Sequence, residues 1–210
     1  MPKLLRTHKP IRDGLDHWLA NDRRFVESGL TVDDVTAHLD DEFSLSGLAE
    51  TIVGQQLSVK AAATIWGRVK NAVDANDPRA WDDMTDDALR ALGLSFQKIR
   101  YMRGLAQAVA NDQIDFRSLR AAPDGDVIAA LTALKGFGIW SAQMILIFTL
   151  GRPNVWPAGD LGVQEGLRLY RQLKDRPDAR ATDTYGKKRF SPHASSAALL
   201  LWRLKDRNGR

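Results

Sequence analysis

Apolar residues recur along most of this chain at the spacing of helices rather than strands. Between residues 62 and 73 they follow the spacing i, i+3, i+4, i+7, i+11 (Ala62, Ile65, Trp66, Val69 and Val73), which places them on one face of a helix. No sustained alternation of apolar and polar residues is present, and no Asn-Gly or Asp-Gly pair joins two β-branched runs. We therefore predict an all-α protein.

Capping residues indicate where several helices begin. Ser58 is a favourable N-cap for the helix just described, and Asp77 followed by Pro78 is an N-cap with proline at the first helical position. Linkers are short, Gly93 separates two helices, and no internal repeat appears, so we expect roughly ten helical elements. Other predicted helices cover residues 10–21, about 45–56, 86–92, 96–110, about 126–134, 139–150, 161–173 and 194–205.

Composition agrees with a folded protein outside the membrane. The 210 residues are 44% apolar and 27% charged. The longest apolar stretch, 139–150, is interrupted by Ser141, Gln143 and Thr149 and falls short of the roughly 20 residues that span a bilayer. The first ten residues, MPKLLRTHKP, lack the apolar run of a secretory signal. We expect no membrane partner and a cytoplasmic location, associated with the nucleoid if the source is bacterial.

The sequence has no cysteine, which excludes disulfides, thiol nucleophiles and thiolate-ligated metal clusters. Its four histidines, His8, His17, His38 and His193, are scattered, and none forms an i, i+4 pair on one helix face. We expect no catalytic metal.

Charge is unevenly distributed along the chain. The net charge is +4, yet residues 166–210 hold twelve Lys and Arg against four Asp and Glu, a local +8, which leaves −4 for residues 1–165. Clustered cations gain free energy by displacing counterions from phosphates, so this region suggests a polyanionic partner. A solvated basic surface explains the same charge equally well.

A glycine-containing turn lies between two predicted helices. The tetrapeptide Lys135-Gly136-Phe137-Gly138 precedes the strongly apolar helix from Ile139. Glycines allow positive φ and close approach, and their amides with those of the following helix could bind a phosphate. A plain helix-to-helix turn has the same pattern.

Asp160 begins the helix at 161–173, 22 residues after Gly138. A carboxylate at a helix N-terminus is stabilised as an anion by the helix dipole and the unpaired amides. Such a fixed negative charge could stabilise a sugar cation. Asp160 could also be only an N-cap, and the two roles are compatible.

Together these segments resemble the helix-hairpin-helix (HhH-GPD) superfamily of base-excision DNA glycosylases, and most closely its 3-methyladenine DNA glycosylase II (AlkA-like) branch. The likeness covers roughly residues 45–205. Besides the hairpin and Asp160, it rests on Ile52-Val53-Gly54-Gln55-Gln56-Leu57-Ser58, on 92–100 and on Phe190-Ser191-Pro192-His193.

The resemblance implies two helical subdomains with the active-site cleft between them. One would comprise about 1–50 with about 150–210, and the other about 51–149 with the hairpin at 127–150. It also implies a monomer that binds double-stranded DNA containing damaged bases.

The resemblance assigns roles to particular residues. It makes Asp160 the catalytic aspartate. The hairpin residues Lys135, Gly136, Phe137 and Gly138 would bind a DNA phosphate, and their main-chain carbonyls would hold a monovalent cation. Either Gln56 or Leu57 would be the wedge that fills the gap left by a flipped nucleotide, although a loop residue and a core leucine are the plainer interpretations.

The resemblance also places Trp140, Met144 and His193 around the base pocket. Trp140 stands where strand-cutting relatives carry a Schiff-base lysine, and tryptophan cannot form an imine. An electron-poor alkylated purine would stack on its indole. Trp140 could instead be a core aromatic, and His193 a surface residue at a helix start.

The sequence therefore predicts a monofunctional glycosylase for 3-methyladenine and 7-methylguanine that needs no nucleotide, redox or metal cofactor. Three alternatives stay open. They are a non-catalytic DNA-binding module, a helical interaction scaffold, and a bifunctional glycosylase/lyase for oxidised bases, which Trp140 disfavours.

Overall fold

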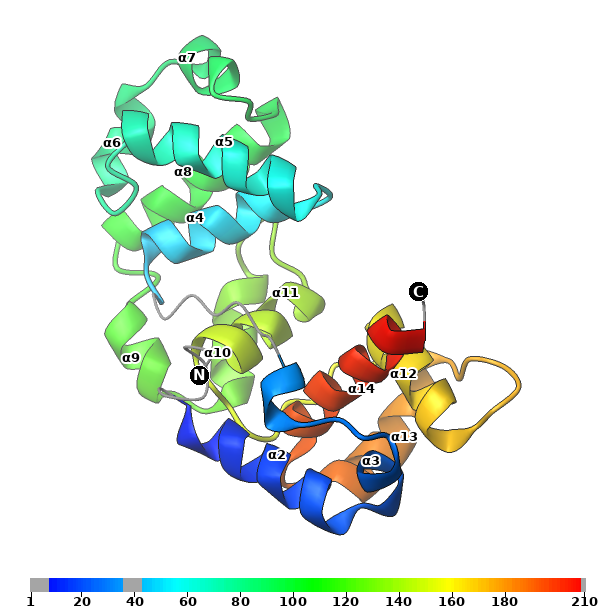
Figure 1. Cartoon of the computed structure of the whole chain (residues 1–210). Helices are drawn as coiled ribbons and strands as arrows, with labels where there is room; N and C mark the ends of the chain where they lie inside the picture. Colours follow the sequence, from blue (N-terminus) through cyan, green and yellow to red (C-terminus); the bar gives the residue numbers. More distant parts are fainter. Residues whose placement is uncertain (1–7, 36–42, 209–210) are drawn as a thin grey trace. The chain divides into compact units, whose positions relative to one another are not determined.

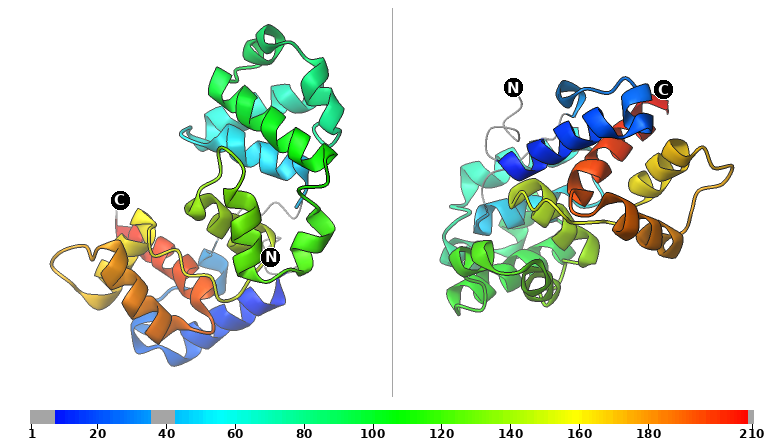
Figure 2. Two further views of the ribbon diagram at one scale, coloured as in Figure 1. Left: turned by 180° about the vertical axis from the view of Figure 1, so that it is seen from behind. Right: turned by 90° about the horizontal axis from the view of Figure 1, so that it is seen from below.

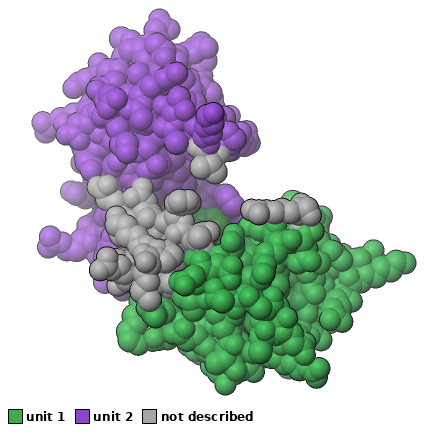
Figure 3. Space-filling model, viewed as in Figure 1, with its two compact units in different colours: residues 1–41, 143–210 green, residues 42–142 purple. Residues whose placement is uncertain are grey.

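The computed structural model describes residues 8–35 and 43–208, and within these ranges every regular element is a helix (Figure 1). The prediction of an all-α fold is confirmed. None of the described helices is long and apolar enough to cross a bilayer. The chain divides into two compact units, residues 1–41 with 143–210 (unit 1) and residues 42–142 (unit 2) (Figure 3). The subdomain boundaries expected from the sequence are at about residues 50 and 150.

In unit 2, α4 (Leu45–Gly54) packs against both α5 (Val59–Ala72) and α8 (Phe96–Ala110) (Figure 1). Its core contains fully buried side chains such as Ile52, Trp81 and Ile99. Burial of such side chains supplies most of the driving force for folding. The remaining helices are α6 (Pro78–Asp83), α7 (Asp86–Ala91), α9 (Phe116–Ala121), α10 (Asp124–Thr132) and α11 (Ile139–Met144), whose last two residues belong to unit 1.

Unit 1 centres on α14 (Ala194–Asn208), which packs against α12 (Leu161–Arg171), α2 (Lys9–Asn21) and α13 (Ala179–Phe190) (Figure 2). The short α3 (Arg23–Glu27), η1 (Val32–Asp34) and the π-helical turn η2 (Ile145–Thr149) complete it. Gly166 lets α12 approach α14 closely, because a Cβ at this position would lie 2.2 Å from the carbonyl oxygen of Leu201.

A buried carboxylate joins three helices of unit 1. Asp22 is only 3% exposed and caps α3 by accepting hydrogen bonds from the N–H groups of Arg24 and Phe25. Its other oxygen accepts a hydrogen bond of 2.8 Å from the Tyr170 hydroxyl on α12 and pairs with Arg189 on α13. Burial, followed by this hydrogen bond, raises the pKa of Tyr170, so the hydroxyl remains a donor.

Several predicted boundaries agree with the structure, and others need correction. The helix 96–110 has the predicted ends, and Ser58 and Asp77 are N-caps as expected. The predicted helix 139–150 is instead α11 followed by the π-helical turn η2. Three helices were not predicted: α3, α9 and α13. The buried face of α13 consists of Thr182, Gly186 and Phe190, which is too weak an apolar stripe to show in the sequence.

Candidate active site

Asp160 occupies the N-cap of α12, where sequence reasoning placed it. The turn before it is closed by a hydrogen bond of 2.9 Å from the Asp160 N–H to the Pro157 carbonyl. Its side-chain Oδ1 accepts a hydrogen bond of 2.8 Å from the Val163 N–H, one of the α12 amides that lacks an intrahelical partner. The helix terminus therefore fixes the orientation of this half-buried side chain.

A tryptophan that the sequence did not single out completes this arrangement. The indole Nε1 of Trp202, on α14, donates a hydrogen bond of 2.7 Å to the same Oδ1 of Asp160. One neighbour of the indole is Phe148, whose ring stacks on it with centroids 5.6 Å apart. Another is Gly162, where a Cβ would lie 2.7 Å from the indole Cδ1. Two directed donors thus converge on one carboxylate oxygen.

The π-helical turn η2 positions Phe148 for this contact. Its wider hydrogen-bond pattern is seen in the bond of 3.0 Å from the Leu150 N–H to the Ile145 carbonyl, five residues earlier. Such turns are frequent at functional sites. The sequence shows only a continuous apolar helix here, so neither the π-turn nor the pairing of Phe148 with Trp202 could be read from it.

The segment that leads to Asp160 is anchored within unit 1 by two side chains, Ser195 and Gln164. Ser195 Oγ accepts a hydrogen bond of 2.9 Å from the Val155 N–H and donates one of 2.6 Å to the Arg152 carbonyl. The side-chain Nε2 of buried Gln164 donates a hydrogen bond of 2.9 Å to the Ala158 carbonyl. These bonds satisfy backbone groups of a loop that would otherwise be mobile, and they hold Asp160 in place.

In unit 2 the predicted hairpin forms between α10 and α11. Gly136 has φ +99° and lies against the ring of Tyr101, where a Cβ would be 2.5 Å from Cδ2, so glycine is required there. Gly138 is not in the left-handed region, and a Cβ there would meet nothing within 4 Å. Of the two hairpin glycines, Gly136 therefore uses a positive φ and Gly138 does not.

The hairpin backbone groups are partly committed to the turn. The Phe137 N–H donates to the Leu134 carbonyl, and the Phe137 ring is buried. The Gly136 carbonyl accepts a hydrogen bond of 2.7 Å from the Gln55 side chain. Each of these carbonyls retains a second lone pair, so the chemistry of the hairpin remains compatible with a bound monovalent cation. Lys135 and Gly138 are exposed.

The side chains proposed as the wedge and as the stacking face for the base are exposed, unlike core residues. Trp140 is 51% exposed and Leu57 is 40% exposed. Gln56 is also exposed and has φ +58°, an unusual value for a residue that is not glycine. The plainer interpretations of Trp140 and Leu57 as core residues are therefore wrong. Met144 is half-buried, one helical turn after Trp140.

His193 packs against α2. Its ring centroid lies 5.2 Å from that of His17, and its carbonyl accepts a hydrogen bond from the Trp18 indole. Its buried Nδ1 has no hydrogen-bond partner among the described residues.

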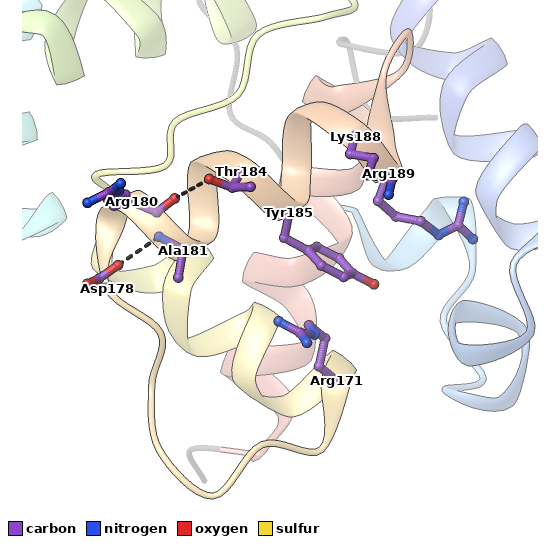
Figure 4. Close-up of a pocket in the computed structure, with 8 residues that line it drawn as sticks. All are labelled: Arg171, Asp178, Arg180, Ala181, Thr184, Tyr185, Lys188 and Arg189. Carbon is purple, nitrogen blue, oxygen red and sulfur yellow. Dashed lines mark hydrogen bonds between the residues drawn. The ribbon is translucent and has the colours of Figure 1, made fainter.

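A cavity in unit 1 is remote from Asp160. It measures about 710 Å³ and is lined by Arg171, Arg180, Lys188 and Arg189 around the ring of Tyr185 (Figure 4). The Arg171 guanidinium lies 4.4 Å from the centroid of that ring. Arg171 ends α12 and Asp160 caps its start, so about 16 Å of helix separates them. The cavity belongs to the basic C-terminal surface and not to the candidate site.

The fold and the site define an all-α protein of the helix-hairpin-helix class. The chain belongs to the HhH-GPD superfamily of base excision DNA repair proteins, whose family model matches residues 49–192. A curated DNA-3-methyladenine glycosylase 1 of Schizosaccharomyces pombe is 32% identical over 163 residues, 74% of this chain and 70% of the relative. These matches confirm both the superfamily and the 3-methyladenine branch. The chain spans only 57% of the length of another curated relative, from Bacillus subtilis.

Solved structures of 3-methyladenine DNA glycosylases are also similar to this chain. A DNA-3-methyladenine glycosidase of Bacillus halodurans superposes with a TM-score of 0.77 and 31% identity, covering 93% of this chain and 90% of that one. The 3-methyladenine DNA glycosylase of S. pombe in complex with abasic DNA superposes with a TM-score of 0.72 and 26% identity, covering 90% and 95%.

Proposed function

We propose that this protein excises alkylated bases, 3-methyladenine and 7-methylguanine, from double-stranded DNA by hydrolysing the N-glycosidic bond. The observation that carries the proposal is the carboxylate of Asp160, held by the α12 terminus and by Trp202. Family membership and the names of the relatives support the same reaction.

Asp160 would act through its charge. Methylation at N3 or N7 makes the base cationic and a good leaving group, so the departing base needs little protonation. As the bond breaks, positive charge develops on the sugar, and a preorganised anion stabilises it. The same carboxylate would orient the attacking water. Because both donors engage Oδ1, they fix the direction of the carboxylate group before the substrate binds.

Residues of unit 2 would bind the DNA and the extruded nucleotide. An exposed indole such as that of Trp140 offers a face on which a cationic purine stacks. Extruding the base costs a few kcal/mol, and a wedge at Gln56 or Leu57 would compensate for the lost stacking. The exposed Lys135 and the amide of Gly138 would bind a backbone phosphate, and a monovalent cation at the hairpin carbonyls would add positive charge there. In this scheme the protein acts as a monomer.

The deciding experiment is to incubate the protein with methylated duplex DNA and to identify the released bases by chromatography. Release of 3-methyladenine and 7-methylguanine, leaving an uncut strand with abasic sites, is the expected result. Binding of the duplex without any release would favour a non-catalytic module. Release of oxidised bases with strand cleavage would favour the bifunctional alternative.

A further inference from the structure

The first two turns of α8 hold the predicted wedge loop and the hairpin together. Lys98 and Tyr101 are three residues apart and therefore lie on one face of this helix. Lys98 reaches the loop 54–58, and Tyr101 packs against Gly136 of the hairpin. Gln55 connects these two segments directly. We name the group formed by Lys98, Tyr101, Gln55 and Gly136 the α8 latch.

Lys98 completes the hydrogen bonding at the end of α4. A helix leaves its last carbonyls without intrahelical partners. Here the Ile52 carbonyl accepts from the Gln55 N–H and the Gly54 carbonyl accepts from the Leu57 N–H. The Lys98 ammonium donates to the two others, Val53 O at 2.7 Å and Gln55 O at 2.9 Å.

The position of the ammonium has an energetic cost and a compensating gain. Partial burial lowers the pKa of Lys98, so the charge is held there at a cost in solvation. A cation at a helix C-terminus is favourably placed with respect to the helix dipole. Within the part of the chain that the structure describes, no carboxylate pairs with Lys98, so the two carbonyls are its polar partners.

Gln55 extends the connection to the hairpin. Its side-chain Nε2 donates a hydrogen bond of 2.7 Å to the Gly136 carbonyl, 81 residues away in sequence. On the other side of Gly136 lies the Tyr101 ring, whose hydroxyl accepts a hydrogen bond of 2.6 Å from Gln97. The hairpin is therefore held from the loop by Gln55 and from α8 by Tyr101.

The contacts of Gln55 explain the backbone conformation of the next residue, Gln56. Gln56 has φ +58°, a conformation that is energetically unfavourable for residues other than glycine. Such a residue persists only where the surrounding contacts determine its conformation. Both of its neighbours are fixed, Gln55 by Lys98 and Gly136, and Leu57 by the Gly54 carbonyl.

We propose that Lys98 and Gln55 are positioning residues that keep the wedge loop rigid and in register with the phosphate-binding hairpin, so that insertion of the wedge and grip on the phosphate occur as one step. This inference rests on the proposed function, in which the loop enters DNA and the hairpin binds phosphate. The ligand of the wedge loop and the hairpin is the DNA duplex itself, and no additional ligand is required.

The test uses the full chain and two readouts. Fluorescence of 2-aminopurine next to a tetrahydrofuran abasic analogue reports unstacking without requiring excision, and single-turnover release of 3-methyladenine reports catalysis. Lys98→Met should lower both roughly tenfold, as expected from the loss of hydrogen bonds to a charged group. Lys98→Arg, which keeps the charge and the donors, should restore most of the loss. Lys70→Met on α5 is the matched control, because the Lys70 ammonium lies over the Trp66 ring, 5.8 Å from its centroid, and donates to no carbonyl of the wedge loop or hairpin among the described residues.

A double-mutant cycle distinguishes a latch from a general loss of stability. If Lys98 acts through the wedge, its effect should disappear once the wedge side chain is removed. The double variant of Lys98→Met with Gln56→Ala, or with Leu57→Ala, should then unstack the 2-aminopurine only slightly less than the more impaired of its two single variants. Additive losses with both wedge variants would overturn the proposal, as would unchanged unstacking in Lys98→Met. If Lys98→Met does not fold, Gln55→Met carries the same cycle from the hairpin side, with the same overturning result.

The two proposals fail in different ways. If the wild-type protein inserts its wedge into the abasic duplex but releases no methylated base, the proposed reaction is contradicted. The proposed role of Lys98 and Gln55 is not. Wild-type protein that excises normally, with unstacking insensitive to Lys98 and Gln55, would contradict the latch alone.

Discussion

The indole N–H of Trp202 donates a hydrogen bond of 2.7 Å to the carboxylate of Asp160, 42 residues away in sequence. This bond joins the C-terminal helix α14 to the N-terminus of α12. The helix end supplies the second bond to the same oxygen, from the Val163 N–H. The carboxylate is thereby oriented by two elements that pack on one another.

Asp160→Asn tests the role of the charge. The amide oxygen can still accept hydrogen bonds at the N-cap, so the fold should persist, whereas the anion is lost. We expect single-turnover excision to fall by roughly 100-fold or more, with affinity for an abasic duplex retained. Asp178→Asn is the control, because Asp178 caps α13 in the same manner. Excision close to the wild-type rate would remove Asp160 from the mechanism.

Trp202→Phe removes one donor and keeps an aromatic ring against Phe148. A hydrogen bond to a charged group contributes about 1.5–3 kcal/mol, so excision should fall roughly 10- to 100-fold with little change in DNA affinity. Trp156→Phe provides the comparison, since its indole donates to the Thr182 carbonyl in the core. That variant should lose stability in thermal unfolding rather than activity. Equal effects of the two substitutions on excision would contradict a specific role for Trp202.

Gly162→Ala tests whether the packing of Trp202 matters. The added Cβ would lie 2.7 Å from the indole Cδ1 and 3.0 Å from the Asp160 oxygen, so the indole must shift. We expect excision to fall while the melting temperature changes little, because alanine favours the helix. Gly159→Ala, where a Cβ meets nothing within 4 Å, should behave as the wild type. If both variants are fully active, the Trp202 geometry is not critical.

Substitutions at the two hairpin glycines should have different effects, one on DNA affinity and the other on stability. A Cβ at position 138 would meet nothing within 4 Å, so the Gly138→Val protein should fold and lose affinity for damaged and undamaged duplex alike. Affinity of the wild type should fall with salt, log K declining by about 0.9 per neutralised phosphate, and the variant should show a smaller slope. Gly136→Ala, which clashes with Tyr101 at a positive φ, should lower the melting temperature instead. Normal binding by folded Gly138→Val would make the hairpin only a turn.

The product should be an intact strand with an abasic site. Strand cleavage by β-elimination requires an amine that forms an imine with the sugar aldehyde, and Trp140 has none. Borohydride should therefore trap no covalent complex, and nicking should require alkali or heat. Trapping that disappears in Lys135→Ala would show instead that the exposed Lys135 serves as the amine, and would favour the bifunctional alternative.

The sequence by itself determined the helical class, most helix starts, the family and the position of Asp160. These features depend on local physics, namely the period of apolar residues and the pairing of an N-cap side chain with amides two or three residues away. Ser58, Asp77 and Asp160 all cap helices for this reason.

Only the tertiary structure decided which side chains meet. Trp202 reads in the sequence as one more apolar residue of a terminal helix, and its contact with Asp160 exists because Gly166 brings α12 close to α14. The bonds from Lys98 to Val53 and from Gln55 to Gly136 depend in the same way on how α8, α4 and the hairpin pack. Such contacts join residues 42 to 81 positions apart, and no local pattern records them, because side-chain packing in the folded chain sets them.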